Sequence, residues 1–66
     1  MKVSLTAKTL RRLIFDNENA KIILNDEYVT ESAARRILFD YEVMELIAPN
    51  DEIEVELTEN KIEFKL

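Results

Sequence analysis

Apolar and polar residues alternate strictly in two runs near the C-terminus, over residues 52–57 and 61–66. A period of two places every second side chain on the same face, which is typical of a strand with one buried face. The alternation breaks at Glu59-Asn60, so it predicts a β-hairpin over residues 52–66 that turns there. In this register six apolar side chains pair on one face: Ile53 with Leu66, Val55 with Phe64 and Leu57 with Ile62.

A helical pattern precedes this hairpin. Apolar residues recur at spacings of three and four, which is the period of an α-helix with one buried stripe. These residues are Ala33, Ala34, Ile37, Leu38, Tyr41 and Met44. Thr30 is a suitable N-cap and Pro49 is a stop signal, so we predict a main helix over about residues 31–47.

The same segment carries a second apolar stripe on its far side, formed by Phe39, Val43, Leu46 and Ile47. A helix that is apolar on two sides is usually buried on two sides, and a chain of 66 residues has little other structure to cover both. We therefore expect a homodimer in which this stripe meets its own copy. The alternative is that the helix breaks near Asp40 and that residues 43–47 form a strand or a bent segment.

The N-terminal segment contains weaker patterns. Residues 2–5 alternate like a short strand. Thr6 is placed to cap a second short helix over residues 7–15, which has apolar residues at helical spacing. The alternative for this region is an all-strand meander through residues 10–24.

Residues 20–29 predict a second hairpin, which turns at Asn25-Asp26. In its register Ile23 lies opposite Tyr28. Together these elements predict a single α+β domain over residues 1–66, in which a small antiparallel β-sheet of four to six strands packs on one main helix.

The amino-acid composition excludes several kinds of functional site. The chain has 14 acidic and 9 basic residues, a formal net charge of −5, and no Cys, His or Gly. These absences exclude disulfides, thiolate and imidazole metal sites, an imidazole base and glycine-rich phosphate loops. No apolar run is long enough for a membrane span or a secretory leader. We expect a cytoplasmic protein that is not an enzyme, holds no cofactor or metal, and does not bind membranes.

Two charged sets are candidates for partner binding. The predicted C-terminal hairpin carries a row of carboxylates on its outer face, formed by Glu52, Glu54, Glu56 and Glu63. This row could dock on a basic protein surface, or it could keep an exposed sheet soluble. Two basic doublets could hold a partner's phosphates or carboxylates, or could lie solvated beside apolar stripes. The doublets are Arg11-Arg12 and Arg35-Arg36. Because the net charge is negative, we do not expect nucleic acid as a partner.

The C-terminal segment resembles part of a known family. Leu46-Ile47-Ala48-Pro49-Asn50-Asp51, with the two alternating strands that follow, is similar to the second half of the swapped-hairpin (AbrB/MazE-type) DNA-binding domains. In that family a short helix leads through a Pro-Gly-Asp turn into an acidic strand and a returning strand. Here Asn50 stands where the family has glycine. The resemblance implies an intertwined dimer that regulates transcription or serves as an antitoxin.

The size, charge and patterning favour a small, acidic, non-enzymatic protein–protein interaction module. We expect a homodimeric accessory or inhibitory factor of phage, prophage or bacterial type. The alternative is the swapped-hairpin regulator or antitoxin that the resemblance implies.

Overall fold

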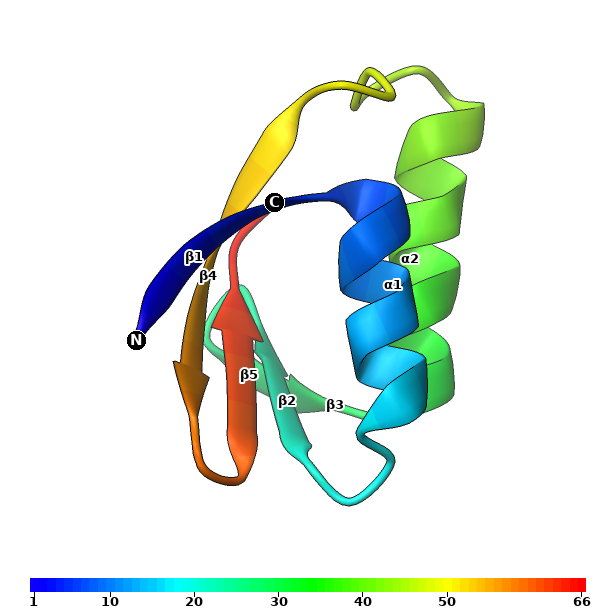
Figure 1. The fold of residues 1–66 in the computed structure, drawn as a ribbon. Coiled ribbons are helices and arrows are strands. Elements are labelled where there is room, and N and C mark those ends of the chain that lie inside the picture. The colour runs from blue at the N-terminus through cyan, green and yellow to red at the C-terminus, as the bar shows by residue number, and fades with distance from the viewer.

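The computed structural model describes all 66 residues, as five strands and two helices. Along the chain these are β1 (Lys2–Thr6), α1 (Ala7–Asp16), β2 (Lys21–Leu24), β3 (Glu27–Val29), α2 (Glu31–Val43), β4 (Glu52–Thr58) and β5 (Lys61–Phe64). Both helices lie side by side on one face of the sheet, and the other face is uncovered (Figure 1). This two-layer arrangement confirms the predicted α+β class. Neither helix combines the length and the apolar character that crossing a membrane requires.

The five strands form one sheet in the order β1-β4-β5-β2-β3. All neighbouring pairs are antiparallel except β2 and β5, which run parallel. The sheet is therefore mixed, and the predicted antiparallel arrangement is wrong only for this pair. The parallel pair arises because α1 carries the chain back across the sheet, so that β2 runs in the same direction as β1. The β4–β5 hairpin then inserts between β1 and β2.

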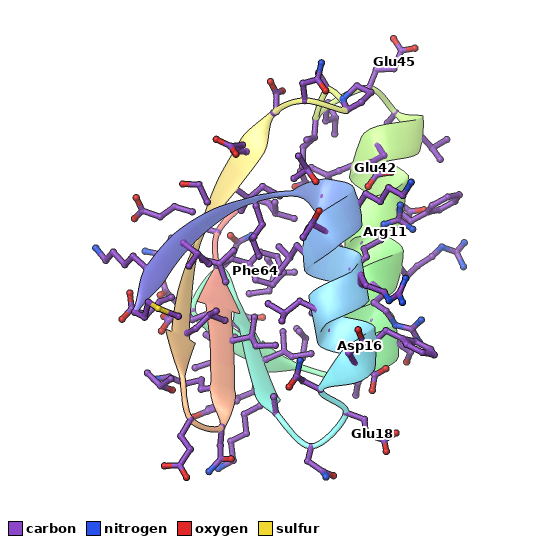
Figure 2. The ribbon with its side chains drawn as sticks, in the orientation of Figure 1. Arg11, Asp16, Glu18, Glu42, Glu45 and Phe64 are labelled. Carbon is purple, nitrogen blue, oxygen red and sulfur yellow. The ribbon has the colours of Figure 1, made fainter.

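The core lies between the helix layer and the sheet. Its buried residues are all apolar: Ala7, Leu10, Ile14, Ile22, Leu24, Ala34, Leu38, Ile53, Val55, Ile62 and Phe64. Phe64 of β5 points from the sheet toward the helices (Figure 2). Burial of apolar surface stabilises a domain by about 25 cal/mol per Å², so these contacts hold the two layers together.

The β4–β5 hairpin keeps the predicted register, in which Val55 lies opposite Phe64. The ladder ends at this pair, so the predicted pairing of Ile53 with Leu66 is wrong. The Leu66 amide instead donates a hydrogen bond to the Asn25 side-chain oxygen at 2.9 Å. This bond draws the end of the chain toward the turn after β2 and away from β4.

The β2–β3 hairpin is confirmed, with Ile23 opposite Tyr28 as predicted. Its turn residues Asn25 and Asp26 have φ angles of 51° and 68°. Asn and Asp tolerate this left-handed conformation better than other residues with a β-carbon. Two such residues in succession form the tight turn that matches the twist of a hairpin.

The N-terminal segment forms strand β1 and helix α1, and not the all-strand meander through residues 10–24. Thr6 is the N-cap of α1, since its hydroxyl accepts a hydrogen bond from the Thr9 amide at 3.3 Å. Leu10 and Ile14 lie one turn apart and are fully buried. The predicted short helix is therefore confirmed, and it runs one residue further than expected.

Helix α2 ends earlier than predicted. The apolar pattern extends to about residue 47, but the helix stops at Val43. Glu45 takes a φ of 59°, and the Leu46 amide donates back to the Tyr41 carbonyl at 2.9 Å. This six-to-one hydrogen bond is that of a Schellman C-cap, with glutamate where glycine is usual. The alternative is a break near Asp40 with a strand or bent segment over residues 43–47; the helix in fact continues past Asp40 to Val43, and residues 44–47 form a bent segment.

Candidate protein-interaction surface

The two helices are built from a repeated sequence. Thr6, Arg11, Arg12, Phe15 and Asp16 recur 24 positions later as Thr30, Arg35, Arg36, Phe39 and Asp40. The units that contain them, β1-α1-β2 and β3-α2-β4, share one topology, because the two strands of each unit run parallel. The repeat becomes visible when the sequence is aligned with itself at this offset. The spacing of apolar residues alone does not reveal it.

Each copy of the repeat makes the same local contacts. The hydroxyl of Thr6 or Thr30 caps its helix by accepting a hydrogen bond from the amide three residues later, at 3.3 or 3.1 Å. The second arginine of each copy pairs with the aspartate one turn later. These ion pairs are Arg12–Asp16 at 3.3 Å and Arg36–Asp40 at 3.2 Å.

The helices run antiparallel, so the two copies face each other across an approximate two-fold axis (Figure 1). The Arg11 guanidinium carbon lies 5.6 Å from the ring centroid of Phe39, and that of Arg35 lies 5.1 Å from the ring centroid of Phe15. Each copy thus places its first arginine on the phenylalanine of the other copy. At these distances the cation is attracted to the ring face, which holds both side chains in place.

A groove of about 580 Å³ follows the seam between α1 and α2, and we call it the helix groove. It is lined by Lys8, Arg11, Arg12, Phe15, Ser32, Arg35, Arg36 and Phe39. The structure therefore brings together the two basic doublets that the sequence presents separately.

Two phenylalanines of the groove are unusually exposed. Phe15 and Phe39 remain 58% and 47% exposed, although large apolar side chains are usually buried. Neither Phe15 nor Lys8 is singled out by the apolar pattern.

One ion pair breaks the symmetry of the repeat. Arg11 donates through Nε and Nη2 to the two carboxylate oxygens of Glu42, at 3.2 and 3.0 Å, and so joins α1 to the last turn of α2 (Figure 2). The equivalent position in the first copy is Glu18, which lies in the turn beyond the end of α1 (Figure 2). Arg35 therefore pairs with Glu31, at 3.6 Å, and its Nε is buried without a hydrogen-bond partner.

The helix groove is less basic than its lining alone indicates. Five lining residues are cationic, but each of the four arginines pairs with a carboxylate at its edge. With these partners counted, the surface carries 5 − 4 = 1 positive charge. Arg12 and Arg36 donate to their partners through Nε, so the terminal amino groups of both still offer unused donors.

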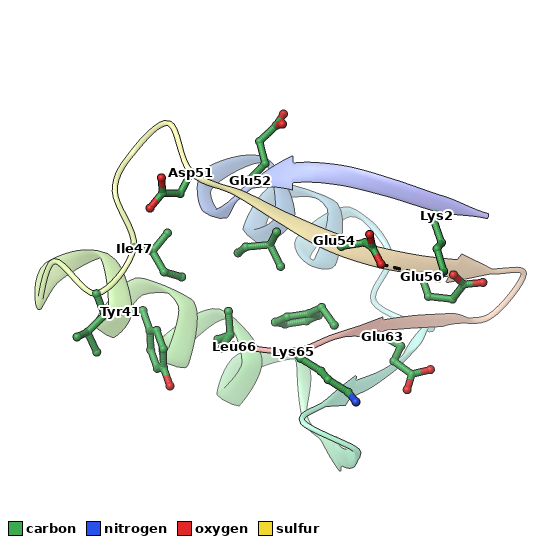
Figure 3. A pocket seen from close by; sticks show the side chains of 13 residues that line it. Lys2, Tyr41, Ile47, Asp51, Glu52, Glu54, Glu56, Glu63, Lys65 and Leu66 are labelled. Carbon is green, nitrogen blue, oxygen red and sulfur yellow. Dashed lines mark ion pairs between the residues drawn. The ribbon is translucent and has the colours of Figure 1, made fainter.

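The predicted row of carboxylates lies on the uncovered side of β4 and β5. Its four members line a second groove, of about 750 Å³, near the end of the chain; they are Glu52, Glu54, Glu56 and Glu63 (Figure 3). Three of them have an amino group nearby: Glu54 has Lys2 at 3.8 Å, Glu56 has the N-terminus at 3.5 Å and Glu63 has Lys61 at 3.9 Å. The row is therefore closer to neutral than the sequence indicates.

The predicted dimer stripe is not one continuous helical face. Phe39 lies in the helix groove, whereas Val43 lies in the last turn of α2 and is 63% exposed. Leu46 and Ile47 come after the helix, because Glu45 ends it. Leu46 is 60% exposed, and Ile47 packs against the core of its own chain. The part of these four residues in a dimer stays a prediction.

A scan against protein-family models and searches of the curated proteins and of the solved structures found no match. The segment that resembles the swapped-hairpin domains forms the bend after α2 and the β4–β5 hairpin. This hairpin pairs with β1 and β2 of the same chain. The regulator or antitoxin role that the resemblance implies stays a prediction.

Proposed function

We propose that the protein is a non-enzymatic module that binds another protein, and that the helix groove is its recognition surface. The main support for the proposal is that all four arginines of the chain and two exposed phenylalanines line this one groove. Arginine and aromatic residues are enriched among the side chains that contribute most to binding at protein interfaces.

The stacked pairs Arg11–Phe39 and Arg35–Phe15 also support a binding role. Long side chains normally lose conformational entropy when a partner immobilises them, at about 0.5–1.5 kcal/mol for each side chain. Here the aromatic rings already hold two of the guanidinium groups in place. A partner therefore meets a surface that is partly ordered before it binds.

A protein partner fits the charge of this surface better than nucleic acid does. The chain has a net charge of −5, so its long-range field repels a polyanion. The excess of one positive charge at the helix groove acts only at short range, where the phenylalanine rings also offer apolar contact. This combination suits a segment that has both carboxylates and apolar side chains.

The cellular role that we assign is that of a small cytoplasmic accessory or inhibitory factor of phage, prophage or bacterial type. Such a factor acts by covering a functional surface of its partner. The support for this role is the small size of the chain, its acidic balance and the lack of His and Cys for nucleophilic or acid–base catalysis.

A photo-crosslinking experiment tests the proposed recognition surface. A benzophenone amino acid replaces Phe15 in the helix groove, and in a matched control it replaces Tyr28, an aromatic residue of β3 that is 70% exposed. Illumination in the producing cell should give one specific protein adduct from the Phe15 site that the Tyr28 site does not give. Identical adducts from both sites, or none from the Phe15 site, would overturn the proposal.

Self-association is a second candidate, favoured by the exposure of Phe39 and Val43 one turn apart on α2. A two-fold dimer centred on the helix groove would bring the arginines of both copies together, which is electrostatically unfavourable. A dimer centred on the Val43 end of α2 avoids this repulsion. The oligomeric state in solution distinguishes this candidate from a monomeric module.

A further inference from the structure

We infer that the segment bound in the helix groove is an acidic amphipathic α-helix, which lies along the seam of α1 and α2 on the side of the helix layer that faces away from the sheet. This inference rests on the proposed function and adds the conformation and charge of the docking segment. It is carried by the spacing of the lining residues, by the offset of the two phenylalanine rings and by the charge of the groove.

The lining residues repeat with the period of a helix. The groove takes Lys8, Arg11, Arg12 and Phe15 from α1, and Ser32, Arg35, Arg36 and Phe39 from α2. Side chains at spacings of three and four form ridges, and a third helix packs into the valley between them at about 8–10 Å from its neighbours. A β-strand instead needs the open backbone edge of a sheet, which a layer of helices does not offer.

The two phenylalanine rings define positions for two apolar anchors. Arg11 stacks on Phe39, and Phe15 lies four residues further along α1. Four residues span about 6 Å along a helix, or about one turn, so a comparable offset along the groove is expected between the positions that carry the two rings. Side chains at positions i and i+3 or i+4 of a bound helix have this separation. The docking helix thus carries two apolar residues three or four positions apart.

Carboxylates of the docking helix that lie beside these apolar anchors can accept hydrogen bonds from cationic side chains of the groove. Arg12 and Arg36 keep their terminal amino groups available, and Lys8 has no ion-pair partner in the chain. Hydrogen bonds between such cations and Asp or Glu are about twice as strong as neutral ones. Because Arg12 and Arg36 are equivalent positions of the repeat, they should contribute about equally to binding.

Fluorescence anisotropy with three labelled synthetic peptides tests the inference. The first is a helical peptide of about four turns that carries two leucines at i and i+4 with flanking glutamates. The second has the same composition plus two central prolines, and the third has lysine in place of glutamate. The first should bind best, and each of Arg12→Ala and Arg36→Ala should weaken it by about tenfold. Lys61→Ala, which removes a cation from the sheet, should leave binding unchanged.

Several outcomes would overturn the inference. These are no binding of the helical peptide at millimolar concentration, equal binding of the proline peptide, or tighter binding of a DNA duplex. Contact of a crosslinked partner through a non-helical segment would also overturn it, although the proposed function would stand. If the helical peptide does not bind and the Phe15 site gives no specific crosslink, both the inference and the proposed function are wrong.

Discussion

Arg11 and Glu42 form a bidentate ion pair that joins the two helices, with Nε–Oε1 and Nη2–Oε2 distances of 3.2 and 3.0 Å. Their side chains are 30% and 26% exposed, so water screens this pair less than it screens the i,i+4 pairs on the outer surface. The pair holds the N-terminal half of α1 against the last turn of α2, and it thereby helps to set the width of the helix groove.

A double-mutant cycle measures this interaction. We expect Arg11→Ala and Glu42→Ala to show a coupling free energy of about 1 kcal/mol in denaturant unfolding. The exposed pair Arg12–Asp16 is the matched control and should show no more than about 0.5 kcal/mol. A coupling for Arg11 and Glu42 as small as that of the control would contradict the structural role given to the pair.

The helix caps test whether the two copies of the repeat are equivalent. Thr6→Ala and Thr30→Ala should each lower the free energy of unfolding by about 1 kcal/mol, because each removes the hydroxyl that accepts a hydrogen bond from the amide of the third residue of its helix. Thr58→Ala, at an exposed end of β4, serves as control and should cost much less. A large loss at only one of the two caps would show that the copies are not equivalent.

The end of α2 offers a stabilising substitution. Glu45 has a φ of 59°, a conformation that costs a residue with a β-carbon about 1 kcal/mol relative to glycine. Glu45→Gly should therefore raise the free energy of unfolding by about 0.5–1 kcal/mol, measured by thermal or denaturant unfolding. Glu59→Gly, in a turn without positive φ, should give no such gain. A lower stability of the Glu45 variant would contradict the assigned C-cap.

Sedimentation equilibrium tests the predicted homodimer. A dimer at micromolar concentration would have about twice the 7.8 kDa chain mass. Val43→Glu should then give the monomer mass and remain folded, because Val43 is largely exposed in the single chain; its melting temperature should lose only the concentration-dependent part that association supplies. A wild-type protein that stays at the monomer mass at all concentrations would contradict the dimer and leave the single chain as the binding module.

Local patterns were enough to predict most elements of the fold. The alternation around Val55 and Phe64 specifies the hairpin register, since a slip by one residue would expose the entire apolar face. The parallel pairing of β2 with β5 has no local signal, because it depends on where the β4–β5 hairpin inserts. The end of α2 was missed because Glu45 occupies a position that glycine usually marks.

The candidate site was only partly predictable. Each basic doublet is visible in the sequence, but their meeting depends on the antiparallel packing of α1 and α2. Apolar periodicity assigns residues to a core, and Phe15 contributes to the surface instead. The carboxylate row was predicted on the correct strands. Its partial neutralisation by Lys2 and the N-terminus depends on β1 pairing with β4, which is a long-range contact.

The most direct test of the helix groove as the recognition surface is the dissociation constant of the partner captured at Phe15, measured for two double variants. Arg12→Glu with Arg36→Glu reverses charge in the groove, and Glu54→Lys with Glu56→Lys reverses charge on the sheet. We expect the first to weaken binding by at least about a hundredfold and the second to change it by less than about twofold. Loss of binding in the sheet variant alone would contradict this account and make the carboxylate row the docking surface.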